Sequence, residues 1–139
     1  MLTATYGRTR IGAHELDGEL LKDVEGTLWM REIIEKPRVE SLTAEEFDRM
    51  MVGVDPPAGA GERSDACGIV VCGSRGGMLY LLEDSSVRGL SPEGWASRVA
   101  AAAARWDTAE VVAEVNNSGA MVESVLEAAD FALRLVHTR

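Results

Sequence analysis

The sequence of 139 residues contains few cysteines, few aromatic residues and no long hydrophobic run. No stretch approaches the roughly 18 apolar residues that a transmembrane helix needs, and the N-terminus lacks the basic-then-apolar order of a secretion signal, so we expect a cytoplasmic protein. The two cysteines, Cys67 and Cys72, lie in one apolar run, CGIVVCG. Their spacing is not that of a zinc site or a disulfide framework, so we expect two small core residues.

Basic residues are also scarce, with 14 Lys and Arg against 23 Asp and Glu and a net charge of −9. Because nonspecific affinity for nucleic acid comes from neutralising phosphates, this balance argues against a general polyanion binder. Any contact with DNA must be local, or must be provided by a partner. A cluster of acids that binds divalent cations is consistent with the negative charge, although a solvated acidic surface is the commoner reason for it.

Several motifs for other chemistries are missing. The glycine-rich stretch AGAG lacks the Gly-Lys followed by Ser or Thr of a phosphate-binding loop, so ATP hydrolysis is not expected. His14 and His137 are isolated from any second zinc ligand, and the chain has no GxSxG nucleophile elbow. Metal-assisted hydrolysis by carboxylates is the enzyme class that remains.

The first 48 residues form a more acidic segment, with 11 acids and 6 bases, and they predict short helices rather than a sheet. Ile11, Leu16 and Leu20 give a weak helical stripe, and TLWMREIIEK predicts a helix with Thr27 as a possible N-cap. Pro37 ends that helix, and Thr43 with Glu46 has the spacing of a capping box. We interpret residues 1–48 as a helical extension and residues 49–139 as the main domain.

From Met50 onward, short β-type runs are bounded by Gly, Pro, Ser and Asp. A helix beginning after Ser91 has that residue as N-cap, Pro92 at its first position, and Leu90 placed to contact Trp95. The predicted order is strands over 50–55, 67–73 and 78–84, a helix over 92–106, a strand over 109–116, a helix over 118–130 and a strand over 132–137.

The second and third runs are separated by the tight SRGG turn, so they should form an antiparallel hairpin, whereas the last two strands should pair in parallel across a helix. The inward faces of the two helices are predicted to be Trp95, Val99, Ala102, Ala103 and Trp106, and then Met121, Val122, Val125, Leu126 and Ala129. This order predicts an α/β protein with a mixed five-stranded sheet flanked by helices.

Two acids stand out as possible metal ligands. Asp55 closes the first strand and is followed by two prolines that cannot continue a ladder, which places its carboxylate at the end of the sheet. Glu114 lies in the apolar run VVAEV, where a carboxylate needs a cation, a metal or hydrogen bonds to stay ionised. Carboxylate oxygens suit Mg²⁺ or Mn²⁺, and two such ions can activate water against a phosphodiester.

Purely structural roles for these acids also remain open. Asp55 could cap a turn, and Glu114 could pair with an arginine such as Arg49 or Arg134. Asp84 could approach the same edge, although a role at the entry to a turn before Ser85 is more usual, and Asp65 could either reach the metal or simply begin a strand. We rank Asp84 and Asp65 below the first two acids as ligands.

The motifs VGVDPP, SDACGIVVCG, LYLLED, RGLSPEGWA and VVAEVNNSGAMVESVL, in this order, resemble the RNase H-like nuclease domain of phage-type terminase large subunits. YGRTRIGAHELDGELL and EGTLWMREII are similar to the segment that joins the packaging ATPase of these proteins to the nuclease. The resemblance therefore covers nearly the whole chain. It identifies Asp55 and Glu114 with the family's first and second metal-binding acids.

The resemblance implies an endonuclease that cuts double-stranded DNA during packaging in a phage, prophage or gene-transfer agent, with two Mg²⁺ or Mn²⁺ ions in the complete site. It also implies a bacterial host cell, with the portal protein and the small terminase subunit as partners. The family's third acid lies beyond the fifth strand, so a chain that stops at Arg139 is expected to lack it. A noncatalytic remnant that acts as an interaction or DNA-docking module is therefore the alternative.

Overall fold

The computed structural model describes residues 28–57, 65–114 and 119–138, and these residues fall into two compact units that divide between Ser41 and Leu42. In the first unit, a short helix α3, Arg31–Glu35, begins after Met30 and ends before Pro37. Its own Ile33 and Ile34 are exposed, as are Leu28 and Trp29 just before it. The stripe expected from Ile11, Leu16 and Leu20, the N-cap expected at Thr27 and the expected placement of His14 lie outside the described residues.

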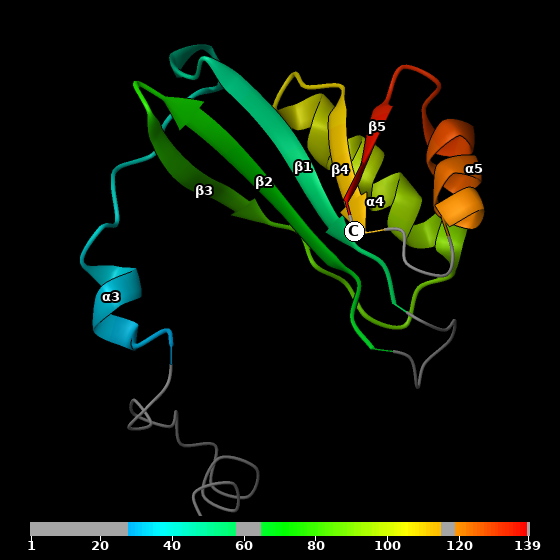
Figure 1. The fold of residues 1–139 in the computed structure, drawn as a ribbon, viewed down its shortest axis with the longest axis horizontal. Helices are drawn as coiled ribbons and strands as arrows, with labels where there is room; N and C mark the ends of the chain where they lie inside the picture. Colours follow the sequence, from blue (N-terminus) through cyan, green and yellow to red (C-terminus); the bar gives the residue numbers. More distant parts are fainter. Residues whose placement is uncertain (1–27, 58–64, 115–118, 139) are drawn as a thin grey trace, which may run out of the picture. The chain divides into compact units, whose positions relative to one another are not determined.

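The second unit begins with a 3₁₀ turn, η1, Ala44–Glu46, in which the backbone N–H of Thr43 donates to the carboxylate of Glu46 at 2.7 Å, as the capping-box spacing predicts. Five strands follow: β1, Arg49–Asp55; β2, Gly68–Arg75; β3, Met78–Asp84; β4, Glu110–Glu114; and β5, Arg134–Thr138. Their order across the sheet is β3-β2-β1-β4-β5 (Figure 1). The predicted mixed sheet is confirmed.

Strand pairing follows the turn chemistry and the helical connections. β2 pairs with β1 and with β3 antiparallel, and the β2–β3 turn contains Gly76 and Gly77, both at positive φ. Two consecutive residues in the left-handed region are what a two-residue hairpin of matching twist requires, and glycine adopts that region without strain. β4 pairs in parallel with β1 and β5, as predicted for strands joined through helices.

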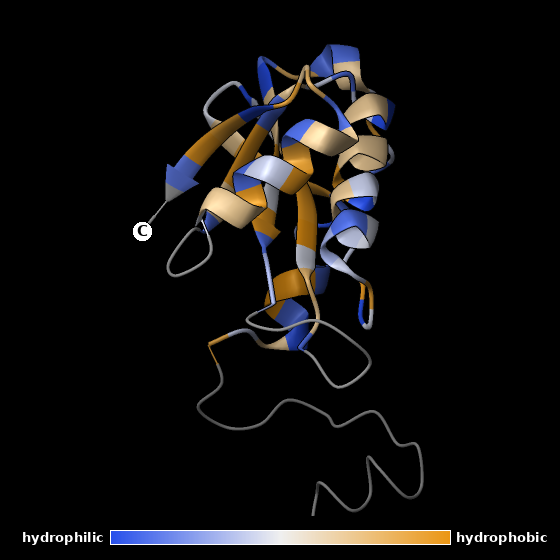
Figure 2. Ribbon diagram, turned by 90° about the vertical axis from the view of Figure 1, so that its right-hand side faces the viewer, coloured by the Kyte–Doolittle hydropathy of each residue, from blue (hydrophilic) through white to orange (hydrophobic). Residues whose placement is uncertain are grey.

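Helix α4, Pro92–Arg105, begins as the sequence predicts, with the Ser91 hydroxyl accepting a hydrogen bond from the Gly94 N–H at 3.2 Å. Helix α5, Gly119–Ala129, contacts α4, and the two helices lie side by side over one face of the sheet (Figure 2). Alanines at the buried positions of α4 let its backbone approach the strands closely.

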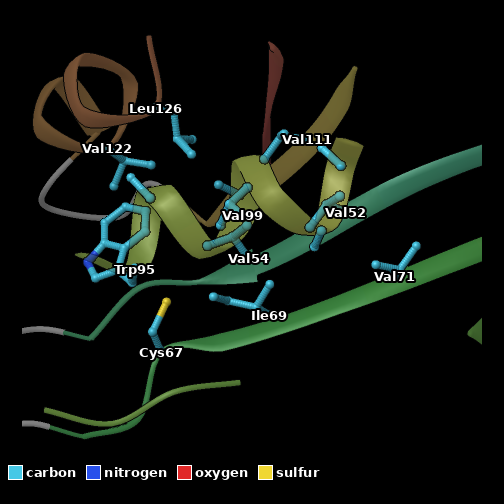
Figure 3. Close-up of a cluster of buried hydrophobic side chains, with 14 residues drawn as sticks. Val52, Val54, Cys67, Ile69, Val71, Trp95, Val99, Val111, Val122 and Leu126 are labelled. Carbon is cyan, nitrogen blue, oxygen red and sulfur yellow. The ribbon is translucent and has the colours of Figure 1, made fainter. Parts of the chain in front are cut away.

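A single apolar core lies between the two helices and the sheet. Figure 3 shows Trp95 of α4 between Val122 of α5 and Cys67, which precedes β2. The fully buried members also include Val52, Ile69, Val71, Val99, Val111 and Leu126. Burying a side chain of this size contributes about 1.5–3 kcal/mol, so this layer is the main source of stability of the second unit.

Some predicted inward positions are wrong. Met121 and Ala129 of α5 are exposed, because the helix contacts its neighbours mainly through Val122 and Leu126. Cys72 is only half-buried, since strand alternation turns it to the opposite face from Ile69 and Val71. We call that opposite face, which carries Cys72 and not α4 or α5, the open face of the sheet.

The open face is partly apolar. Leu79 and Leu81 of β3 and Val136 of β5 are exposed. Arg49 and Glu110, which form an ion pair at 2.8 Å, lie at the end of this face where β1 and β4 begin. Among the helices of the described ranges, none is long and apolar enough to cross a membrane.

Candidate active site at the ends of two parallel strands

The parallel pairing of β1 and β4 sets Asp55 and Glu114 beside each other. Val52, Gly53 and Val54 have Val111, Val112 and Ala113 as their Cα partners, and the two acids are the next residues along each strand. Neighbouring strands lie about 4.8 Å apart, and residues in register point to the same face. Because Val54 and Ala113 are buried against the helices, alternation turns both carboxylates to the open face.

Both acids are exposed, which corrects the argument that Glu114 is a costly charge inside an apolar strand. Glu114 is the last residue of β4, and its side chain is exposed on the open face rather than enclosed in the core. The prolines after Asp55 end β1 as predicted. The arginines proposed as alternative partners are elsewhere: Arg49 and Arg134 lie 2.8 Å and 3.7 Å from the carboxylate of Glu110, at the other end of β4.

On the side of β2, Asp55 lies directly beside a glycine. Its Cα partner is Gly68, and a Cβ placed on that glycine would lie 3.3 Å from the Asp55 Cβ. A side chain at this position would therefore crowd the carboxylate. The negative charge of Asp55 also acts on Cys67, the residue before Gly68. Burial is the larger cause and the Asp55 charge the smaller one, and together they raise the pKa of the Cys67 thiol to about 11.

The second-ranked acids occupy different positions. Asp84 ends β3, which β2 separates from β1, and its carboxylate accepts a hydrogen bond from the Ser86 N–H at 3.0 Å. Hydrogen bonds from the hydroxyl and the backbone of Ser86 lower the pKa of Asp84, as in the turn-entry role. Asp65 is exposed and lines a small hollow together with Pro57, Cys67 and Val87, so it lies near the edge where β1 ends.

Two ion-pair centres did not emerge from the sequence. Glu110 binds two arginines from the strands on either side of β4, and Glu83 of β3 binds Arg105 and Trp106 at the end of α4. Glu110 and Glu114 are four residues apart in one strand, so strand alternation places them on the same face, and this spacing could have indicated Glu110 as a second charged residue on that face. No local pattern links Glu83 to Arg105, because that contact depends on how α4 lies over the sheet.

Comparison with known proteins identifies the fold family. The family model described as the terminase RNaseH-like domain matches residues 52–139, a range that includes both Asp55 and Glu114. The chain belongs to the terminase RNaseH-like domain family. The predicted α/β fold, a mixed five-stranded RNase H-like sheet flanked by helices, is thus confirmed, and the chain carries a domain of the nuclease type.

A solved structure of RuvC from Thermus thermophilus is similar to this terminase-family chain, with a TM-score of 0.47 and 20% sequence identity. The similarity covers 64% of this chain and 60% of RuvC, so the chain spans less than two thirds of that protein. A search of curated proteins finds no match.

The donors at the strand ends fit a hard divalent cation. Mg²⁺ and Mn²⁺ prefer carboxylate oxygens, and Asp55 and Glu114 supply two exposed carboxylates from adjacent strands. Within residues 28–57, 65–114 and 119–138, no group of three or more His, Cys, Asp or Glu side chains is gathered for a metal. The described donors therefore fit part of a ligand set, which Mg²⁺ commonly completes with water or substrate phosphate.

Proposed function

We propose that this terminase-family domain is a metal-dependent endonuclease that hydrolyses phosphodiesters of double-stranded DNA, with Asp55 and Glu114 as metal ligands. The observation that carries the proposal is the register of β1 and β4, which puts the two acids next to each other on the open face. Both residues lie within the range that matches the terminase RNaseH-like domain. The implied setting is DNA packaging, with the portal protein and the small terminase subunit as partners and residues 1–48 as the connection to an ATPase.

The two side chains have a definite electrostatic role in this proposal. Without a cation, adjacent carboxylates repel a DNA phosphate, and the net charge of −9 adds to that repulsion. Holding one Mg²⁺ or Mn²⁺ between them cancels their two negative charges, and a second ion would make the local charge positive. When bound, one or two such ions lower the pKa of water and stabilise the charge on the phosphodiester oxygens. Glycine at position 68 avoids the close contact that a side chain there would make with Asp55.

The test is to measure Mn²⁺ binding by water-proton relaxation, and nicking of supercoiled plasmid, with wild-type protein and with Asp55→Asn and Glu114→Ala. Each substitution should weaken Mn²⁺ binding and nicking at least about tenfold, since even outer partners of metal ligands have effects of that size. Glu110→Gln is the matched control, because it removes one negative charge from the same strand and face. Circular dichroism verifies that each variant is folded.

The outcomes separate the proposal from its alternative. Loss of Mn²⁺ binding in the Asp55 and Glu114 variants, but not in the Glu110 variant, supports shared ligation. Equal losses in all three variants would show that general negative charge attracts Mn²⁺, and would reject the two acids as ligands. A wild-type chain that binds DNA but neither binds Mn²⁺ nor nicks plasmid would be a noncatalytic docking module.

A further inference from the structure

The arginines of the second unit fall into two groups. Four of them are already neutralised by glutamates: Arg49 and Arg134 by Glu110, Arg75 by Glu46, and Arg105 by Glu83. The other two in the described part of that unit, Arg88 and Arg98, form no ion pair with a described residue, and both are exposed. Among the described arginines of the second unit, these two are therefore the ones whose positive charge is not balanced by an ion pair.

Arg88 lies at the edge of the sheet where Asp55 ends β1. The residue before it, Val87, forms a bridge with Cys67, with N–H to carbonyl distances of 2.7 Å and 3.0 Å. Cys67 in turn precedes Gly68, the Cα partner of Asp55. The chain from β3 to α4 therefore passes this edge of the sheet (Figure 1). Arg98 lies within α4, two turns away from the Ser91 cap.

The position of Arg88 is fixed by the backbone on both sides. The bridge to Cys67 holds the preceding residue, Gly89 turns the chain at φ 74°, and the Ser91 cap starts α4. A side chain on such an anchored segment loses less freedom when it binds a ligand than one on an unanchored loop. Arginine, with its planar set of donors, is also well suited to phosphate.

The spacing fits one DNA strand. Two strand separations, from β1 to β2 and from β2 to the Val87 bridge, place the Arg88 backbone roughly 10 Å from that of Asp55. The long Arg88 side chain can cover part of this distance, so its guanidinium can reach a phosphate that neighbours one held at Asp55 on the same DNA strand. We propose that Arg88 binds a backbone phosphate of DNA beside the phosphate that is cut, and thereby positions the duplex on the acidic edge.

This inference rests on the proposed nuclease function, but a binding experiment tests it separately from cleavage. The affinity for a fluorescein-labelled DNA duplex is measured by anisotropy in Ca²⁺ over a range of salt concentrations, for wild-type, Arg88→Gln, Arg88→Lys and Arg98→Gln proteins. Loss of one phosphate contact should lower the slope of log affinity against log salt by about 0.9, and reduce affinity roughly eightfold at 0.1 M salt. Mn²⁺ binding, measured in parallel, should not change in Arg88→Gln.

Support requires that Arg88→Gln lowers the slope, that Arg88→Lys restores it by returning the charge, and that Arg98→Gln retains the wild-type slope. An Arg88→Gln slope equal to that of wild-type protein would overturn the inference, as would the same decrease in Arg98→Gln or no duplex binding by the wild-type chain. Absence of Mn²⁺ binding in every protein would instead remove the proposed function, which is a distinguishable result.

Discussion

Glu83 anchors the edge strand β3 to the end of α4, and replacing it with glutamine should destabilise the protein in a pH-dependent way. Its carboxylate accepts hydrogen bonds from the Arg105 guanidinium, the Ser85 hydroxyl and the Trp106 indole N–H, the last at 2.8 Å. The Arg105 bond first, and then the Ser85 bond, lower the pKa of Glu83 from 4.5 to about 2. The Glu83 side chain is 24% exposed and that of Arg105 is 50% exposed.

The size of the effect follows from this pKa. A decrease from 4.5 to about 2, at about 1.4 kcal/mol per pKa unit, sets an upper limit of roughly 3.5 kcal/mol on the charge-dependent contribution. Solvent around the half-exposed Arg105 reduces it, so we expect Glu83→Gln to lower the free energy of unfolding by about 1–2 kcal/mol at pH 7. For a unit of about 100 residues this corresponds to a decrease in Tm of roughly 5–10 °C.

The sign of the pH dependence is fixed by the direction of the shift. Because folding lowers the pKa of Glu83, the stabilisation is complete above the unfolded value near 4.5 and is lost as the pH falls towards 2. Wild-type and Glu83→Gln proteins should therefore differ at pH 7 and converge near pH 2. Thermal unfolding is followed by circular dichroism, since Trp106 fluorescence would itself respond to the substitution.

Glu127→Gln on the exposed surface of α5 is the matched control and should change Tm little at either pH. A Tm difference between wild-type and Glu83→Gln that is the same at pH 7 and pH 2.5 would refute the electrostatic reasoning and assign the effect to packing. No difference at pH 7 would refute the anchoring role itself.

Three further predictions concern the core, the helix cap and the thiols. Leu126→Ala, at a buried position of α5, should lower the free energy of unfolding in urea by about 2–5 kcal/mol. Met121→Ala, on the exposed side of that helix, should lower it much less. Similar losses in the two variants would contradict the inward face assigned to α5. Ser91→Ala should cost about 1 kcal/mol in the same assay by removing the cap of α4, and Ser97→Ala, on its exposed face, is the comparison. In a Cys72→Ser chain, the remaining Cys67 thiol should react with a disulfide reagent with a midpoint near pH 11, and a midpoint near 9 would contradict its burial.

The fold was largely predictable because its signals are local. Strand alternation, the Gly-Gly turn, and the Ser91-Pro92 start of α4 each act over a few residues, and each predicted element that the structure describes is present. The predicted inward face of α5 was partly wrong, because small or apolar residues fill most of its positions and the local pattern alone does not select which of them face the core.

The candidate site was predictable only in part, for a physical reason. Asp55 was identified because it ends an apolar strand, and Glu114 because it interrupts one. Both features can be read from the sequence of a single strand. Their alignment depends on the register of β1 with β4, which no nearby residue encodes. The ion pairs of Glu83 and Glu110, and the unpaired state of Arg88 towards the described residues, likewise depend on which elements become neighbours.

The parallel pairing of β1 and β4 also makes the acidic pair depend on contacts between residues far apart in the sequence. The two strands of a hairpin are close in the sequence, but β1 and β4 are separated in the chain by β2, β3 and the whole of α4, although they are neighbours in the sheet. A split of the chain within α4 should therefore separate the two carboxylates until the halves reassociate. Recovery of Mn²⁺ affinity on mixing such halves would then report directly on completion of the tertiary structure.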